Sequence, residues 1–413
     1  MRSSTGFLVV SATAGWSQIE DPWLILLEGL IVVGIRTVRF IGRLGGHLRA
    51  CPRDARMLRA IFSKQSATTG STYRLSFDLG CNSSEHLEEQ QRILERTMDT
   101  PVRSHHHLTL CVGGAQEDYD FHVKTLGLRS IKKTLLYDGK VPIYHLYYGN
   151  GVGAESTLIT CFPMRQDGRV GRFGSGQVKT VSLSVCTPGL EYWTQRLNRR
   201  GIQNSMRERF GSRRLVFHHP CGIEYELVEV GYDSREPWTG SDIPSEIAVR
   251  GVYGVTIAVR DDREMSAFMT EAMGFKSRGK DGPESRFEVG DGAPGRVVEV
   301  IHTPDLAQGS WTFGEGTVHH VAFKVEDHKT QADFKGYLEG LGYTDCSDAK
   351  DRGYFMSVYF RTPGGALFEA AYTLDGAFLR DETYENLGAT IQTPPWLVDQ
   401  RDEIIARLEP IAY

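Results

Sequence analysis

Two pairs of adjacent histidines are the clearest candidates for chemistry in this chain. The segments "SHHHLTLCV" (104–112) and "TVHHVAFKV" (317–325) each place histidines where a run of strand-forming residues begins. Imidazole is the commonest metal-ligating side chain and also titrates near neutral pH, so these histidines indicate metal binding or proton transfer. A carboxylate in "TPGGALFEA" completes the set His107, His320 and Glu369.

Two histidines and one carboxylate leave one face of an octahedral metal open, which is how non-haem Fe(II) oxygenases bring substrate and dioxygen together. Because side chains alternate along a strand, His107 and Thr109 share one face while Leu108 and Leu110 take the other. A histidine alone on a strand is more often a hydrogen-bonded core residue than a ligand. The matched positions of His107 and His320, with an acid to complete them, favour a metal site.

The strands that carry these histidines belong to a fourfold repeat. Alternating apolar strands occur at 106–112, 178–185, 254–259 and 319–325, and a helix-like segment follows each one and ends at a glycine, which suits a helix C-terminus. Aligning the strands makes four positions equivalent: His107, Thr180, Gly254 and His320. The closing glycines then lie 20 to 22 residues downstream, at Gly127, Gly201, Gly274 and Gly342. Further strand-like runs follow each helix, so the unit is one strand, one helix and about three strands.

Counting ligands predicts how the four modules pair. The last strand of module 4 supplies Glu369, that of module 2 supplies Glu226, and "STLITCFP" of module 1 has no acid. Pairing in sequence order leaves each pair one ligand short. Pairing module 1 with module 4 gathers His107, His320 and Glu369 in one cavity and leaves modules 2 and 3 as a metal-free barrel. The predicted divisions are 104–173, 174–240, 247–312 and 313–375, followed by a tail at 376–413 with a helix after Pro394 and Pro395.

Repeated units of this kind resemble the vicinal oxygen chelate superfamily, whose members are built from βαβββ modules, over residues 104 to 375. The segments "LLYDGKVPIYHLYYG" (135–149) and "DRGYFMSVYFRTPGGALFEA" (351–370) resemble the Fe(II)-dependent hydroquinone and chlorohydroquinone 1,2-dioxygenases in particular. The resemblance implies an α+β fold of four modules forming two half-barrel domains. It implies Fe(II), with Mn(II) as an alternative, on His107, His320 and Glu369, and a small aromatic diphenol and O2 as substrates. The pocket residues that it implies are His106, Thr109, His319, Arg352 and Tyr359.

Other functions on the same fold stay open. A catechol extradiol dioxygenase would use the same ligands, a glyoxalase-type enzyme usually replaces one histidine by a second carboxylate, and a non-catalytic aromatic-binding protein should lack the set. The pocket residues also have structural alternatives. Arg352 could pair with Asp351 or Asp348, Tyr359 could be a packed strand residue, and His106 and His319 could bond the backbone.

The remaining polar residues of these segments are expected to be structural. His218 and His219 precede Pro220, so we expect them in a turn or at the surface. His105 shares a face with His107, but it lies at the extreme edge of its strand and is expected to be exposed. Glu299 and His302 in module 3 are expected to serve structure rather than chemistry.

Composition excludes several classes of function. The formal net charge of the 413 residues is -5, with 47 basic and 52 acidic residues, which does not favour nucleic-acid binding. The seven cysteines are odd in number and form no C-x-x-C pair, so we expect a reducing, cytoplasmic location without disulfides. The longest apolar run, residues 23–34, is shorter than the roughly 20 residues that a membrane helix needs, and no convincing signal peptide precedes it. A homo-oligomer is expected.

Residues 1–97 differ in composition and pattern from the rest of the chain, because they contain basic and serine-rich segments and no repeat. Our hypothesis is that the natural product starts at Met98, just before the first patterned strand, and that the preceding segment is translated upstream sequence or a poorly ordered extension. The alternative is a small helical domain.

Overall fold

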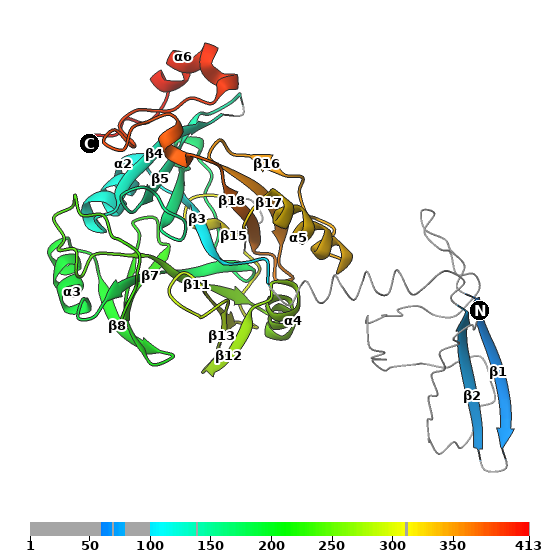
Figure 1. The fold of residues 1–413 in the computed structure, drawn as a ribbon. Helices are drawn as coiled ribbons and strands as arrows, with labels where there is room; N and C mark the ends of the chain where they lie inside the picture. The colour runs from blue at the N-terminus through cyan, green and yellow to red at the C-terminus, as the bar shows by residue number, and fades with distance from the viewer. Residues whose placement is uncertain (1–58, 68–69, 79–99, 138, 310–312, 413) are drawn as a thin grey trace. The chain divides into compact units, whose positions relative to one another are not determined.

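The computed structural model describes residues 59–67, 70–78, 100–137, 139–309 and 313–412 (Figure 1). The chain divides into two units, Met1–Leu94 and Glu95–Tyr413. In the first unit, strands β1 (Arg59–Ala67) and β2 (Gly70–Asp78) pair as an antiparallel hairpin. The hypothesis of a start at Met98 falls on a residue outside the described ranges.

The second unit contains four βαβββ modules, and its fold is the α+β fold expected from the repeat. Module 1 consists of β3 (Ser104–Val112), α2 (Ala115–Tyr119) with the turn η1 (Asp120–Thr125), β4 (Arg129–Leu136), β5 (Ile143–Gly149) and β6 (Leu158–Pro163), followed by η2 (Arg165–Asp167). Module 2 consists of β7 (Gln177–Cys186), α3 (Leu190–Arg199), β8 (Asn204–Arg209), β9 (Ser212–His218) and β10 (Glu224–Val230).

Modules 3 and 4 repeat this order. Module 3 consists of β11 (Gly251–Val259), α4 (Asp262–Ala267) with η3 (Phe268–Ala272), β12 (Lys276–Asp281), β13 (Glu284–Glu288) and β14 (Val297–His302). Module 4 consists of β15 (Thr317–Lys324), α5 (His328–Gly340), β16 (Lys350–Asp351), β17 (Phe355–Arg361) and β18 (Leu367–Thr373). The glycines predicted to close the four helices all have positive φ, from 69° to 100°.

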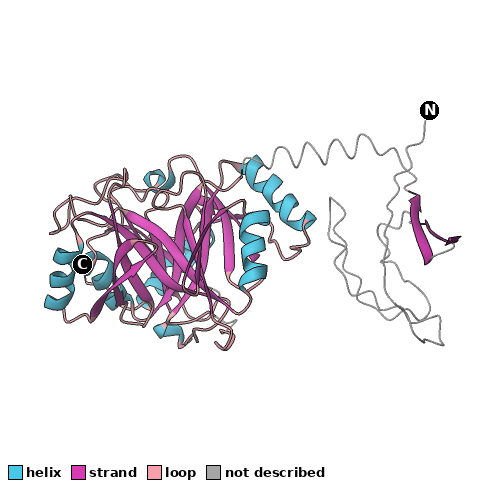
Figure 2. Cartoon of the chain, turned by 90° about the horizontal axis from the view of Figure 1, so that it is seen from below, coloured by secondary structure: helices cyan, strands magenta, loops and turns pink. Residues whose placement is uncertain are grey.

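Hydrogen bonding joins the modules in the pairs that the ligand count predicted. One eight-stranded sheet has the order β16-β17-β18-β15-β3-β6-β5-β4 and combines modules 4 and 1. The other has the order β12-β13-β14-β11-β7-β10-β9-β8 and combines modules 3 and 2. We call them the first barrel (modules 1 and 4) and the second barrel (modules 2 and 3). Figure 2 shows the strands at the centre of this unit with the helices on its outside.

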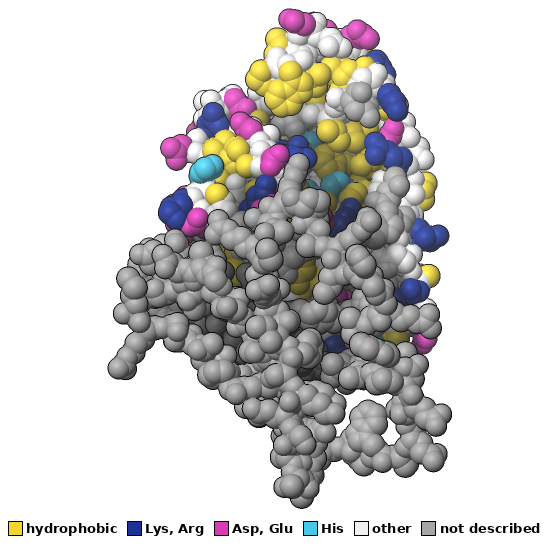
Figure 3. Space-filling model, turned by 90° about the vertical axis from the view of Figure 1, so that its right-hand side faces the viewer, with side chains coloured by type: hydrophobic (Ala, Val, Ile, Leu, Met, Phe, Trp, Pro, Cys, Tyr) yellow, Lys and Arg dark blue, Asp and Glu magenta, His cyan; other side chains and the backbone are white. Residues whose placement is uncertain are grey.

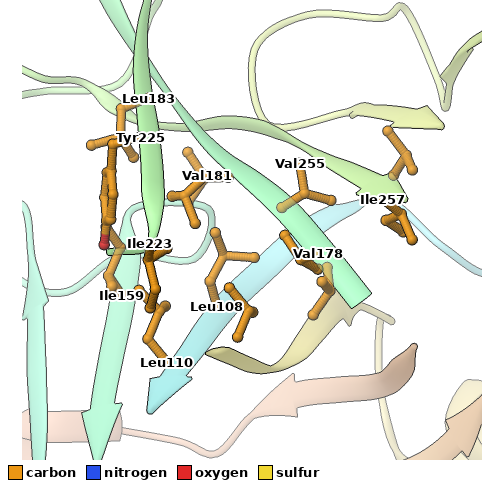
Figure 4. Packing of buried hydrophobic residues seen from close by; sticks show 14 of the residues in the cluster. Leu108, Leu110, Ile159, Val178, Val181, Leu183, Ile223, Tyr225, Val255 and Ile257 are labelled. Carbon is orange, nitrogen blue, oxygen red and sulfur yellow. The ribbon is translucent and has the colours of Figure 1, made fainter. Parts of the chain in front are cut away.

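A shared apolar core joins the two barrels. Leu108 and Leu110 of β3 face away from His107 and are fully buried. They belong to a hydrophobic cluster that also contains Val181 of β7 and Val255 of β11, and Figure 4 shows these side chains between the strands. Burial of large aliphatic side chains such as these contributes roughly 1.5–3 kcal/mol each, so this seam fixes the barrels against each other.

The tail after β18 contains η4 (Ala377–Arg380), η5 (Pro395–Gln400) and α6 (Arg401–Ala406). Leu397 and Ile404 are buried against Leu135 of β4, so the tail covers one side of module 1. No helix in the described part of the chain is both long and apolar enough to cross a membrane.

Candidate metal centre

A pair of β-bulges explains why the histidines come in adjacent pairs. In the antiparallel ladder between β3 and β15, His320 lies opposite Thr109 and Ala322 lies opposite His107, and the register shifts at His106 and at His319. A bulge inserts one unpaired residue and locally breaks the alternation of side chains. His106 and His107 therefore touch each other, as do His319 and His320, although neighbours on a regular strand point to opposite faces.

The side chains of His107, His320 and Glu369 meet in the first barrel. The two Nε2 atoms are 3.1 Å apart, and Glu369 Oε2 lies 2.9 Å from His320 Nε2 and 3.7 Å from His107 Nε2. Two metal bonds of about 2.0–2.2 Å at a right angle separate their ligand atoms by roughly 3 Å, so the spacing fits one ion. All three residues are buried, and Glu369 Oε2 makes no hydrogen bond of acceptable geometry.

The tautomer of His107 supports the same conclusion. Thr373 Oγ1 donates to Glu155 Oε1 at 2.6 Å, so it accepts from His106 Nε2–H at 3.0 Å. His106 Nδ1 is then an acceptor, and His107 donates its Nδ1–H to it at 2.9 Å. The Nε2 atom of His107 therefore carries a lone pair that points toward His320 and Glu369.

His320 also has a neighbouring histidine at its second ring nitrogen, since its Nδ1 lies 2.8 Å from His319 Nδ1. Two imidazole nitrogens and one carboxylate oxygen therefore converge on one point. Such a group of atoms suits a cation. Histidine ligands are commonly oriented through the second ring nitrogen in this way.

Electrostatics keeps the three groups in their ligating forms. Burial lowers the pKa of His107 well below its ordinary value, so the ring stays neutral. Burial alone would raise the pKa of Glu369, but His107 and His320 outweigh it and hold that pKa below its ordinary value. The carboxylate is further held by Ser357, whose Oγ–H donates to Oε1 at 2.5 Å. Sequence reasoning missed Ser357, although its position two residues before Tyr359 puts it on the same strand face.

The other predicted pocket residues surround the centre to different degrees. Arg352, which the resemblance places in the pocket, is exposed, and its Nε–H donates to the Tyr359 hydroxyl at 3.1 Å. The ring of Tyr359 lies 5.5 Å from that of His320. Thr109 is fully buried and its hydroxyl lies 2.7 Å from that of Thr160. His319 lines a pocket together with His320, Phe313 and Arg361. Figure 3, which shows one side of the molecule, has histidine side chains among hydrophobic ones in a recess.

The second barrel places ion pairs where the first has its centre. Glu226 lies opposite Ser182 and Glu299 opposite Thr256, the ladder positions that correspond to Glu369 opposite Ala322. Three arginines neutralise these acids: Arg214 bonds both, Arg209 contacts both, and Arg286 contacts Glu299. Thr180 and Gly254 replace the histidines, so within the described residues this barrel has no comparable ligand set.

A second buried group of ligand-type side chains, Asp118, His122 and Cys161, belongs to a cluster of polar contacts. Tyr148 donates to Asp118 Oδ2 at 2.7 Å, and Asp118 Oδ1 lies 3.1 Å from His122 Nδ1 and 3.3 Å from His219 Nε2. The Cys221 backbone N–H donates to His219 Nδ1, so His219 carries its proton on Nε2, although neither this atom nor Asp118 Oδ1 makes a hydrogen bond of acceptable geometry. This Asp118 cluster joins module 1 to module 2.

The prediction for His105 was wrong, and that for His218 and His219 is confirmed. His219 lies in the turn between β9 and β10, where the first barrel buries it, and His218 beside it is exposed. His105 is buried rather than exposed, because the second barrel covers the start of β3. Its Nε2 lies 2.8 Å from the Val297 carbonyl oxygen. As expected, Glu299 serves a structural ion-pair network, and His302 is exposed.

Paired βαβββ modules with an open two-histidine, one-glutamate set in one of two barrels define the vicinal oxygen chelate class of metalloproteins. A glyoxalase I variant from Zea mays has this fold at 15% identity, with a TM-score of 0.51 over 68% of this chain and 96% of its own. A crystal structure from Bacillus subtilis, of a protein assigned to the dioxygenases, is 33% identical, with a TM-score of 0.70 over 75% of this chain and 98% of its own.

Proteins of similar sequence show to which group within this class the chain belongs. The chlorohydroquinone/hydroquinone 1,2-dioxygenase of Sphingobium indicum is 45% identical over 314 residues, which cover 75% of this chain and 97% of that protein. MhqO of Bacillus subtilis, which is assigned to the ring-cleaving dioxygenases, is 34% identical over 305 residues, 74% of this chain and 95% of its own. No family model matches the sequence. The chain belongs to the ring-cleaving dioxygenases of the vicinal oxygen chelate superfamily and is an oxidoreductase.

Proposed function

We propose that this enzyme opens the ring of a hydroquinone-type substrate with O2, using Fe(II) held by His107, His320 and Glu369. The observation that carries the proposal is the convergence of two imidazole nitrogens and one carboxylate oxygen in a buried site. The substrate class is supported by the name of the Sphingobium relative, which this chain matches over 97% of its length. Mn(II) is the alternative ion, because it accepts similar ligands.

A bound Fe(II) supplies Lewis acidity and open coordination positions at which a phenolic oxygen and dioxygen are held side by side. A para-diphenol cannot chelate one metal through both oxygens, because they lie on opposite sides of the ring. Protein groups must therefore bind the second hydroxyl.

Aromatic side chains border the site and offer apolar contacts to a flat ring. Phe355 lies 4.7 Å from the ring of His107, and Phe313 lies 4.0 Å from that of His319. The ring of Phe162 lies 5.7 Å from that of His319. These apolar walls hold the ring of the substrate and reduce access of water, which strengthens the electrostatic interactions at the site.

Two groups are suited to handle protons at the substrate oxygens. Burial raises the pKa of Tyr359, so its phenol stays protonated at neutral pH, and Arg352 orients it by donating to its oxygen. His319 Nδ1 lies 2.8 Å from His320 Nδ1, and the residue lines the pocket. Both can donate to an oxygen that gains negative charge as the ring opens.

Oxygen uptake tests the proposal. Protein loaded anaerobically with Fe(II) is mixed with oxygenated hydroquinone or catechol, and O2 consumption is followed together with loss of the aromatic absorbance. We expect one O2 per hydroquinone opened and no uptake by Glu369→Gln. Uptake with catechol alone would favour an extradiol catechol dioxygenase, and no uptake with either would favour a non-catalytic binding protein.

Two further expectations remain predictions. A cytoplasmic location is supported by the free thiols of the described cysteines, Cys111, Cys161, Cys186, Cys221 and Cys346. A homo-oligomer rests on the family resemblance alone, and sedimentation of the purified protein would test it.

A further inference from the structure

The wall of the cavity opposite Glu369 is a modified copy of the wall that carries it. In module 4, Glu369 pairs with Ala322 on one side and with Tyr359 on the other. In module 1, Thr160 pairs with Thr109 on one side and with Tyr147 on the other. Thr160 therefore takes the place of Glu369, and Tyr147 that of Tyr359.

The residue that corresponds to Ser357 is His145, since each lies two positions before its tyrosine on the same strand. Ser357 bonds the carboxylate of Glu369, and His145 Nε2 correspondingly lies 3.0 Å from Thr160 Oγ1. A metal-ligating acid and its serine are thus replaced by a hydroxyl and an imidazole. Neither His145 nor Tyr147 was predicted from the sequence to have a role.

These side chains form a continuous hydrogen-bonded row. Thr109 Oγ1 lies 2.7 Å from Thr160 Oγ1, His145 Nε2 follows at 3.0 Å, and the Tyr147 hydroxyl lies 2.9 Å from His145 Nδ1. Thr134 lies opposite His145 in the ladder between β4 and β5, and its side chain contributes to the electrostatic surroundings of the Tyr147 hydroxyl. Thr109, opposite His320, and Thr160 are fully buried, whereas Thr134 is only partly buried, so these residues run from the candidate metal centre toward solvent.

We propose that Thr109, Thr160, His145, Tyr147 and Thr134 form a path that carries the proton of a substrate hydroxyl from the cavity to solvent. The inference rests on the proposed function, because binding of a diphenol as its phenolate releases one proton in a closed site. Thr109 lies two residues from His107 on the same strand face, which puts the start of the path beside the candidate metal centre.

Each link moves one proton and conserves charge. The substrate O–H gives its proton to the Thr109 oxygen, Thr109 gives its own to Thr160, and Thr160 gives its own to His145 Nε2. His145 releases its Nδ1 proton to the Tyr147 oxygen, Tyr147 passes its proton to Thr134, and Thr134 passes its proton to water. The substrate is left as its anion, and His145 has changed tautomer without remaining charged.

The surroundings of His145 suit a group that transmits a proton without keeping it. Burial, with a smaller contribution from the positive charge of Arg352, lowers the pKa of His145 to about 3. Its ring lies between Tyr147 at 4.2 Å and Phe162 at 4.4 Å, so both nitrogens stay directed at their partners. A histidine bonded at both nitrogens by groups that can donate or accept is able to relay in either direction.

The test measures proton release on substrate binding, without turnover. Anaerobic Fe(II)-loaded protein is mixed rapidly with hydroquinone in weak buffer containing a pH indicator. Thr134→Val and Thr160→Val are each compared with the serine variant at the same position, which keeps the hydroxyl. We expect each valine variant to release the proton at least about tenfold more slowly than its serine partner, in line with the usual size of a positioned proton transfer. The affinities of Thr134→Val and Thr134→Ser for the substrate should agree within about twofold, because Thr134 lies away from the candidate metal centre.

Three comparisons keep the outcome decisive. Thr270→Val, an exposed threonine of η3 in the second barrel, controls for the substitution itself. Tyr147→Phe interrupts the row with little change of volume, and it carries the test where a valine variant does not fold. Valine and serine variants that release protons equally fast would overturn the path. Wild-type protein that neither releases a proton nor consumes O2 with hydroquinone would instead overturn the proposed function, and the path with it.

Discussion

The Nε2 atoms of His107 and His320 lie 3.1 Å apart, although 213 positions separate the residues in the chain. Each ring is turned toward the other by the neighbouring histidine in its own β-bulge, His106 or His319, which lies 2.9 or 2.8 Å from the Nδ1 atom. The contact thus depends on pairing β3 with β15 and on two bulges in register. The following predictions test what this arrangement does.

Glu369→Gln should abolish metal binding. The substitution keeps the size of the side chain and removes the negative charge that balances the cation. Added Fe(II) should raise the Tm of the wild type, as any ligand of the native state does, but not that of the variant. Equal responses to metal would contradict the assignment of Glu369 as a ligand.

Ser357→Ala should weaken metal binding by about 10- to 100-fold without removing a ligand, because such supporting hydrogen bonds commonly have effects of that size. The variant loses the donor that fixes Glu369 Oε1. Competition with a chelator measures the change. Ser277→Ala, an exposed serine of β12, is the matched control. Unchanged affinity in Ser357→Ala would show that the glutamate is held by other contacts.

Arg214→Met should destabilise the protein by about 3–5 kcal/mol and leave metal affinity as it is. Arg214 is fully buried and neutralises Glu226 and Glu299, so its loss leaves uncompensated charge in the second barrel. The neighbouring Arg213 pairs with Glu191 at the surface, and Arg213→Met should cost at most about 1 kcal/mol. Chemical denaturation compares the two variants. Similar losses in both would argue against a structural charge network.

Asp118→Asn should destabilise the protein at neutral pH, and the difference from wild type should shrink in acid. Burial alone would raise the pKa of Asp118, but His122 and His219 outweigh it and hold that pKa below its ordinary value of 3.8. A carboxyl whose pKa is lower in the folded state stabilises the protein above about pH 4, and this contribution is lost as pH falls further.

We expect a loss of about 3 kcal/mol for Asp118→Asn at pH 7, the low end for breaking a buried charge cluster. Asp120→Asn, which breaks a partly exposed pair with Lys124, should have little effect at any pH. Unfolding measured from pH 7 to pH 3 gives both profiles. A constant difference between Asp118→Asn and wild type over this range would show that Asp118 is not ionised in the folded protein.

Much of the fold could be predicted because each module repeats the same local signals. The alternating strands and the closing glycines at Gly127, Gly201, Gly274 and Gly342 depend on neighbouring residues alone, and all four glycines have positive φ. The pairing of modules 1 and 4 followed from counting ligands, since a metal needs His107, His320 and Glu369 together.

Positions that depend on contacts between modules could not be predicted. His105 and His219 look like edge and turn residues in the sequence, and both are buried because another module covers them. The sequence did not predict roles for Ser357, His145 and Tyr147. The local sequence does not distinguish a strand residue that faces a metal from one that faces a helix. Their positions become evident only when the two halves of the first barrel are superposed through the pairing of β3 with β15.

By itself the sequence determined the repeat, the candidate ligands and the enzyme family, because short-range patterns and motifs carry that information. The tertiary structure decided which imidazole nitrogens converge on one point, which acids are neutralised by arginine, and which side chains form a row from Thr109 to Tyr147. The physical reason is that these properties depend on atoms within a few ångströms of one another, and strand pairing brings such atoms together from distant parts of the chain.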